Sequence, residues 1–101
     1  MSEVDNLLKK AQDYKKLEVV LNRAYKQAST GKGFDRHSNG LCFEKQPMQV
    51  ISELIGDHHG LLFQAVKKIQ ESVRMDRDKA VHELLGAINY IAGSVIFLER
   101  E

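Results

Sequence analysis

The chain has 101 residues, of which 43% are hydrophobic and 29% charged, and its formal net charge is +1. This length allows one domain with one core, and the balance of apolar and charged residues excludes wholesale disorder. A net charge so close to zero provides no general field for nucleic acid or for an anionic membrane, so we do not expect the protein to bind nucleic acid. The single cysteine, Cys42, excludes an internal disulfide and fits a reducing compartment.

The first 30 residues are predicted to form one long amphipathic helix, because apolar side chains follow helical spacing from residue 3 to residue 28 without glycine or proline. The charged side chains on its other face are expected only to meet solvent. Ser29, Thr30 and Gly31 form a plausible C-terminal signal. Residues 31–46 follow as a loop, since the stretch from Gly31 to Gly40 holds three glycines and shows no periodicity.

Residues 47–101 are predicted to form a short helix and then an antiparallel hairpin. Pro47 suits the first position of the short helix and Gly56 its end, while Asp57 and Asp76 can cap the two hairpin helices. We expect Met48, Ile51, Leu54 and Ile55 to point inward from the short helix, and Leu61, Leu62, Ala65, Val66, Ile69 and Val73 from the next. The sequence therefore predicts a single all-α domain over residues 1–101.

The last helix is apolar on nearly every side, and such a helix must be enclosed. Three other helices, one of them short, would hardly enclose it, so we predict a homo-oligomeric bundle. Gly86 and Gly93 lie one heptad apart and could admit another backbone, Asn89 could fix the register, and Phe97 lies near the chain end. These four residues are the predicted subunit interface. The alternative is the central helix of a monomeric four-helix domain.

The polar loop is the predicted ligand site. Lys32 and Arg36 offer charge-assisted hydrogen bonds to phosphate, and glycines such as Gly33 let backbone N–H groups converge on an anion. His37 and Asn39 add donors, and Phe34 could stack on a base. The loop is not a Walker motif. The alternative is a solvated connection in which Phe34 anchors to the core.

Two adjacent histidines stand at the start of the third helix. His58 and His59 would point about 100° apart, so they would not share one metal ion, and no repeated histidine or cysteine spacing supports a metal site. We predict no metal and no cofactor. As a helix-start pair they could instead contact the phosphate of the loop's ligand. The alternative is a pair of ordinary surface residues.

The sequence HELLGAINYIA, residues 82–92, resembles the acidic helix of the MazG-like all-α nucleoside triphosphate pyrophosphohydrolases. The resemblance implies an oligomeric helical bundle in which ExxE and ExxD pairs on consecutive helices hold Mg²⁺. Glu83 matches the glutamate of ExxD, but Gly86 replaces its aspartate, and Lys68 and Glu71 replace the paired glutamates. A related chain would therefore have lost the catalytic metal site.

The whole chain, with its block RHSNGLCFEKQP, looks like the small accessory proteins of phages and mobile elements, some of which sequester nucleotide signals. We therefore predict a non-enzymatic module that binds a nucleotide-like phosphorylated ligand through the polar loop. One alternative is a divergent Mg²⁺-dependent pyrophosphohydrolase using Glu53, Glu71 and Glu83. Another is a protein that inhibits a host protein through its last helix.

The expected location is the cytoplasm. The N-terminal sequence MSEVDNLLKK lacks the basic start, apolar run and cleavage site of a signal peptide. The most apolar stretch, residues 84–98, is shorter than the roughly 20 residues that span a bilayer, so no membrane contact is predicted.

Overall fold

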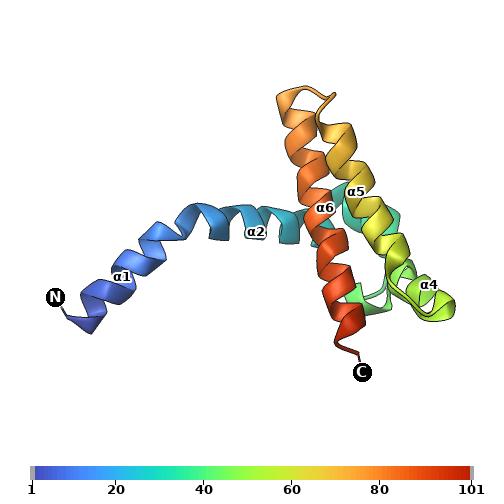
Figure 1. Cartoon of the computed structure of the whole chain (residues 1–101), viewed down its shortest axis with the longest axis horizontal. Helices are drawn as coiled ribbons and strands as arrows, with labels where there is room; N and C mark the ends of the chain where they lie inside the picture. The colour runs from blue at the N-terminus through green and yellow to red at the C-terminus, as the bar shows by residue number, and fades with distance from the viewer. Residues whose placement is uncertain (1, 101) are drawn as a thin grey trace.

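The computed structural model describes residues 2–100, and over that range every regular element is helical (Figure 1). The helices α5 (His59–Ser72) and α6 (Arg77–Leu98) form an antiparallel hairpin. Around it lie α1 (Glu3–Asp13), α2 (Lys15–Ser29), α3 (Gly31–His37), the 3-10 turn η1 (Phe43–Lys45) and α4 (Pro47–Ile55). The predicted all-α class and the C-terminal hairpin are confirmed.

The predicted end signals of α4 and the predicted N-cap of α6 are present, whereas the N-cap of α5 is His58 and Asp57 lies one residue before it. Pro47 opens α4, and Gly56 ends it with a left-handed φ of 90°. Asp57 Oδ1 accepts a hydrogen bond of 2.9 Å from the His59 backbone N–H, and Asp76 Oδ1 accepts one of 3.1 Å from Lys79. These side chains satisfy backbone donors that have no partner within the first turn of a helix.

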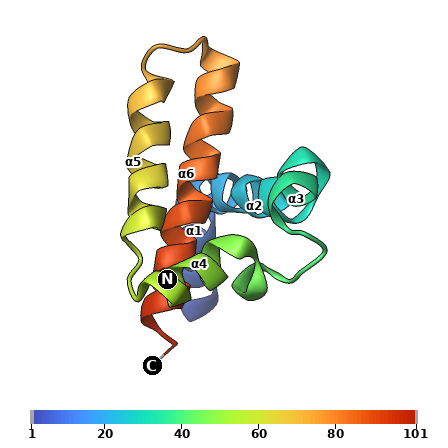
Figure 2. The same cartoon turned by 90° about the vertical axis from the view of Figure 1, so that its right-hand side faces the viewer.

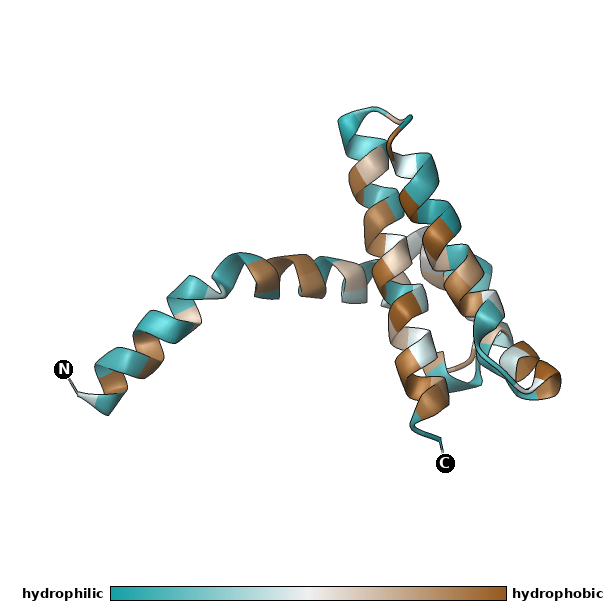
Figure 3. Ribbon diagram, in the orientation of Figure 1, coloured by the Kyte–Doolittle hydropathy of each residue, from teal (hydrophilic) through white to brown (hydrophobic). Residues whose placement is uncertain are grey.

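The N-terminal helix is interrupted at Tyr14, whose φ and ψ are −106° and 9°. Apolar side chains are spaced by alternating steps of three and four residues, but two successive steps of three meet at Tyr14, and such a change shifts the apolar face around the helix. The arm formed by α1 and the first half of α2 projects away from the hairpin, and Figure 3 shows apolar segments along it. No residue of α1 is buried, and Ala24 is the buried residue of α2.

The polar segment is not a loop throughout, because Gly31–His37 form α3. Thr30 is extended and Gly31 has a φ of 65°, so the chain turns sharply after α2 and then coils again. Two glycines weaken a helix by only about 1 kcal/mol each, and contact with α2 supports this one. The prediction missed α3 because its seven residues are too few to show a period.

The core is small and partly polar. Its apolar members include Leu61, Ala65 and Leu85, whereas Gln49 is completely buried and donates from Nε2 to the Gly93 carbonyl at 2.8 Å. The predicted inward face of α4 was therefore wrong, because Gln49 and Ser52 are buried while Ile51, Leu54 and Ile55 are exposed. Without a side chain at Gly93, α6 leaves room for Gln49, and this rotates the apolar side of α4 outward.

The same holds for α5, where Leu61 and Ala65 are buried as predicted but Leu62, Val66, Ile69 and Val73 are exposed. The accessible surface is 7859 Å², whereas monomeric proteins of this mass expose about 5,800 Å². The radius of gyration is 16.2 Å, against about 13 Å for a compact chain of this length. The chain alone thus leaves much apolar surface uncovered.

Helix α6 has 22 residues and, by length and composition alone, could cross a membrane. The core helix of a water-soluble domain meets the same criterion, and α6 contacts α2, α4 and α5. Length by itself therefore does not exclude a span, contrary to the reasoning from residues 84–98.

Candidate functional site

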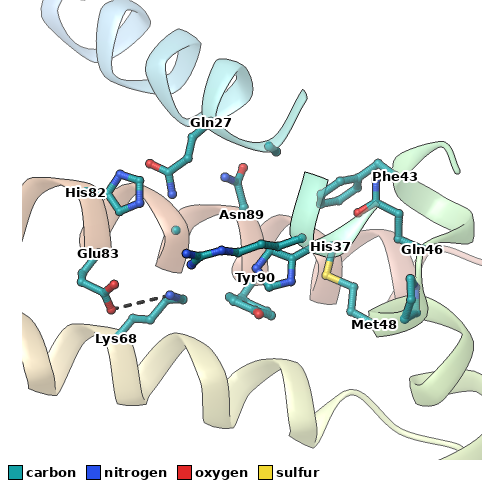
Figure 4. Close-up of a pocket in the computed structure, with 14 residues that line it drawn as sticks. Gln27, His37, Phe43, Gln46, Met48, Lys68, His82, Glu83, Asn89 and Tyr90 are labelled. Carbon is teal, nitrogen blue, oxygen red and sulfur yellow. Dashed lines mark ion pairs between the residues drawn. The ribbon is translucent and has the colours of Figure 1, made fainter. Parts of the chain in front are cut away.

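A cavity of about 530 Å³ lies where α2, α3 and η1 meet the hairpin (Figure 4). Figure 2 shows α2 and α3 beside α6, on the side away from α5. The cavity is bordered by cationic, amide and aromatic side chains together with a few apolar ones. They are Gln27, Ala28, Arg36, His37, Phe43, Gln46, Pro47, Met48, Lys68, His82, Glu83, Gly86, Asn89 and Tyr90.

Helical spacing places these side chains together. On α6, positions 82, 83, 86, 89 and 90 are separated by steps of one, three and four, so they share one side of the helix. Arg36 and His37 belong to the last turn of α3, which α2 holds beside the hairpin. The structure therefore joins the predicted polar segment to the polar side of the hairpin.

Lys68 and Glu83 form the ionic centre of the cavity. Lys68 Nζ lies 3.6 Å from Glu83 Oε2, and both side chains are largely buried. The same ammonium lies 5.9 Å from the centre of the Tyr90 ring, within the range of a cation–π contact. A Cβ at Gly86 would lie 3.3 Å from Lys68 Cδ and Cε, so the missing side chain lets Lys68 cross α6 here.

Two amides connect the walls of the cavity. Asn89 Nδ2 donates to the Ala24 carbonyl at 3.0 Å and so fixes α2 against α6. Gln46 Nε2 donates to the Leu41 carbonyl at 3.1 Å and fixes η1. An amide that donates from its nitrogen can still accept at its oxygen, so both residues can also meet a donor on a ligand.

The Tyr90 hydroxyl stays protonated well into the alkaline range. Burial is the larger cause of its raised pKa, and the negative charge of Glu83 is the smaller. A neutral phenol can donate a hydrogen bond to an anion. Among the side chains that line the cavity, the cations Arg36 and Lys68 outnumber the single carboxylate of Glu83.

Of the predicted ligand residues, Arg36 and His37 line the cavity. Phe34 is partly exposed outside it, and Asn39 has a φ of 51° in a tight turn with Gly40, closed by a 2.8 Å bond from Leu41 N–H to the Ser38 carbonyl. Asn39 therefore shapes the turn. Lys32 and Gly33 belong to α3, but their surroundings lie outside what the structure describes.

The two adjacent histidines are not brought to the cavity. His58 precedes α5, and its ring stacks on Phe97 with centroids 6.0 Å apart. His59 is exposed and lies 3.7 Å from an Asp57 carboxylate oxygen. Neither histidine lines the cavity, and their contact with a ligand stays a prediction.

The predicted interface residues contact their own chain. Gly86 lies beneath Lys68 and Gln27, Gly93 beneath Gln49, and Asn89 bonds to α2. Their part in assembly stays a prediction. The sequence did not point to Phe43, Gln27 or Tyr90 as cavity residues, because the residues next to them in the chain do not distinguish them from core or surface positions.

The glutamates of the enzymatic alternative have different partners. Glu53 pairs with Arg100, Glu71 lies 3.9 Å from Lys67, and Glu83 pairs with Lys68. Over the described residues, no three histidine, cysteine, aspartate or glutamate side chains gather closely enough to hold a metal ion.

Comparisons with protein-family models, curated proteins and solved structures gave no match for this chain. The resemblance to the MazG-like family stays a prediction.

Proposed function

We propose that this protein is a non-enzymatic binding module that holds a phosphorylated, nucleotide-like ligand in the cavity between α3 and the hairpin. The supporting observation is that one cavity of about 530 Å³ joins Arg36, Lys68 and two histidines to the aromatic rings of Phe43 and Tyr90. Pockets for small ligands commonly enclose about 300–1,000 Å³. The combination suits a molecule with an anionic part and a flat part.

The cavity offers suitable side chains for both the phosphate and the base of such a ligand. The planar guanidinium of Arg36 can hold a phosphate through two parallel hydrogen bonds, and Lys68 adds a point charge. Phe43 and Tyr90 offer ring faces for a base, and the oxygens of Gln46 and Asn89 can accept from its edge. These interactions require no chemical step, which is why we favour binding over hydrolysis.

The proposed ligand competes with Glu83 for Lys68. The Lys68 ammonium is paired with the Glu83 carboxylate at 3.6 Å. A phosphate with two or more negative charges can replace the carboxylate as its partner. Binding is therefore expected to weaken as salt concentration rises.

Isothermal titration calorimetry with four compounds tests the proposal. ATP and cyclic AMP carry both a base and phosphate, pyrophosphate carries phosphate alone, and adenosine carries the base alone. We expect binding of at least one phosphorylated nucleotide and none of adenosine. At a ligand concentration of 100 times Kd, linkage predicts stabilisation by about 2.7 kcal/mol, or roughly 10–20 °C in Tm for a domain of this size.

Variants assign the binding to the cavity. Arg36→Gln and Lys68→Gln should each weaken binding at least about tenfold, since each removes a charge-assisted bond of about 1.5–3 kcal/mol. Lys67→Gln is the matched control, because Lys67 is the neighbouring lysine and is half exposed. Equal binding by all three variants, or no binding of any phosphorylated compound, would contradict the proposal.

A further inference from the structure

The hairpin carries two exposed apolar stripes, one on each helix. Along α5 the stripe consists of Leu62, Val66 and Ile69, continued by Val73 directly after the helix, and along α6 of Leu84, Ile88, Ile91, Val95 and Leu98. Apart from the half-buried Ile88, all of these side chains are between 38% and 81% exposed. Their steps of three and four residues are those of a helix that packs along another helix.

Both stripes lie on the same face of the hairpin. On α5 each stripe residue follows by one position a residue directed toward α6, as Leu62 follows Leu61 and Ile69 follows Lys68. On α6 the same offset holds toward α5, since Leu84 follows Glu83 and Ile91 follows Tyr90. One residue is a turn of about 100° in a fixed sense. Because the two helices run in opposite directions, the same turn away from the neighbouring helix brings both stripes to one face of the hairpin.

This bare face is opposite the cavity. Gly86 and Gly93, which lie under side chains from α2 and α4, are about 180° around α6 from Leu84, Ile91 and Val95. Helices α2 and α4 therefore cover one face of the hairpin, where α3 and η1 border the cavity, and the other face is left uncovered. The hairpin has the form of half of a four-helix bundle.

We propose that a second copy of this chain covers the bare face, hairpin against hairpin, in a two-fold four-helix bundle. A standard interface takes about 800 Å² from each partner. The chain exposes 7859 Å², roughly 2,000 Å² more than a monomer of its mass, so it has enough surface for such an interface. The proposed interface lies on the side of α6 opposite to Gly86 and Gly93, whereas the sequence predicted the interface on the glycine side. This interface does not depend on the proposed ligand.

Charge at the ends of α6 fixes the arrangement. Arg77 and Glu99 flank the stripe on the same side of the helix, and no charged residue lies on that side between them. Ile88 stands midway between the two. When α6 packs antiparallel on the second copy's α6 with the axis at Ile88, each Arg77 faces a Glu99 of the second copy. Opposite ends thus attract, and a parallel pairing would bring like charges together.

The level of α5 agrees with this axis. Lys68 crosses α6 at Gly86, and Leu61 lies beside Gly93. Moving back along α5 from Lys68 to Leu61 therefore corresponds to moving forward along α6 from Gly86 to Gly93. Val66 is therefore level with Ile88, near the middle of its own stripe. A two-fold axis at the level of Val66 and Ile88 therefore pairs each stripe with the same stripe of the second copy.

Analytical ultracentrifugation of the full chain tests the proposal. We expect the wild type to sediment as a dimer or an even multiple of it. Ile91→Lys should raise the dimer dissociation constant by about 100-fold or more, because it places unpaired charges in a desolvated interface. Leu54→Lys is the matched control, since Leu54 is 82% exposed on α4 outside the bare face. Circular dichroism checks that each variant remains helical.

A charge exchange tests the register even if Ile91→Lys fails to fold. Arg77→Glu and Glu99→Arg should each weaken the dimer about threefold or more, and the double variant should restore it. A monomeric wild type at 100 µM would overturn the proposal. So would a dimer that survives Ile91→Lys but is lost in Leu7→Lys, because that result would place the second copy on the arm. Single charge variants without effect would overturn the antiparallel register.

Discussion

The carboxylate of Glu83 distinguishes the binding module from the enzyme most sharply. If the protein is a binding module, Glu83 is paired with the Lys68 ammonium to which the ligand's phosphate would bind, since Lys68 Nζ lies 3.6 Å from Glu83 Oε2. In a pyrophosphohydrolase the same carboxylate would bind Mg²⁺. Glu83→Gln therefore has opposite effects under the two hypotheses: it improves ligand binding under the first and removes activity under the second.

The size of the improvement follows from Coulomb's law. A phosphate seated on Lys68 beside Glu83 would have a negative charge about 6 Å from the carboxylate. At that separation, two unit charges repel by about 0.7 kcal/mol in water and about 3 kcal/mol at an effective dielectric constant of 20. Both side chains retain some solvent exposure, 26% for Lys68 and 21% for Glu83, and salt screens the pair, so we adopt about 1 kcal/mol. Glu83→Gln should then tighten binding roughly fivefold.

Calorimetry with the tightest of the four compounds, at two salt concentrations, measures this change. The gain should shrink at high salt because its origin is electrostatic. Glu71→Gln is the matched control, since Glu71 pairs with Lys67 and does not line the cavity. Weaker or unchanged binding by Glu83→Gln would refute the reasoning, and Mg²⁺-dependent release of pyrophosphate that is lost in the same variant would establish the enzyme instead.

Two further predictions concern the supports of the site. Because burial and Glu83 raise the pKa of Tyr90, its folded-state pKa lies above the unfolded value of about 10, and the folded protein keeps a proton that the unfolded chain releases. The unfolding free energy should therefore fall as pH rises above about 10, and urea unfolding at pH 9 and 11 should show a smaller fall for Tyr90→Phe; an equal fall would be evidence against the raised pKa. Gln49→Met should lower the unfolding free energy by about 1–3 kcal/mol, because it removes the buried 2.8 Å bond to Gly93, whereas the exposed Gln70→Met should change it by less than about 0.5 kcal/mol. Equal denaturation midpoints for these two methionine variants would contradict that role for Gln49.

Local rules were sufficient for the elements of the C-terminal half. A proline at a first helical position, a glycine that adopts a positive φ and an aspartate that accepts a backbone N–H act within one turn, so the bounds of α4, α5 and α6 could be predicted. The same rules failed at Tyr14 and in α3. A helix of seven residues with two glycines depends on its neighbour, α2, and the sequence gives no direct sign of that contact.

The direction of each amphipathic face was decided only by tertiary structure. The sequence shows that α4 and α5 have apolar sides, but it does not show whether those sides meet the hairpin or a second chain. Gly93 admits the amide of Gln49, so α4 packs through its polar side, while α2 holds α3 where Arg36 and His37 line the same cavity as Lys68. The sequence by itself determined the helices of the C-terminal half and the excess of apolar surface. Which polar residues share a cavity, and which apolar ones remain uncovered, depended on contacts between residues far apart in the chain.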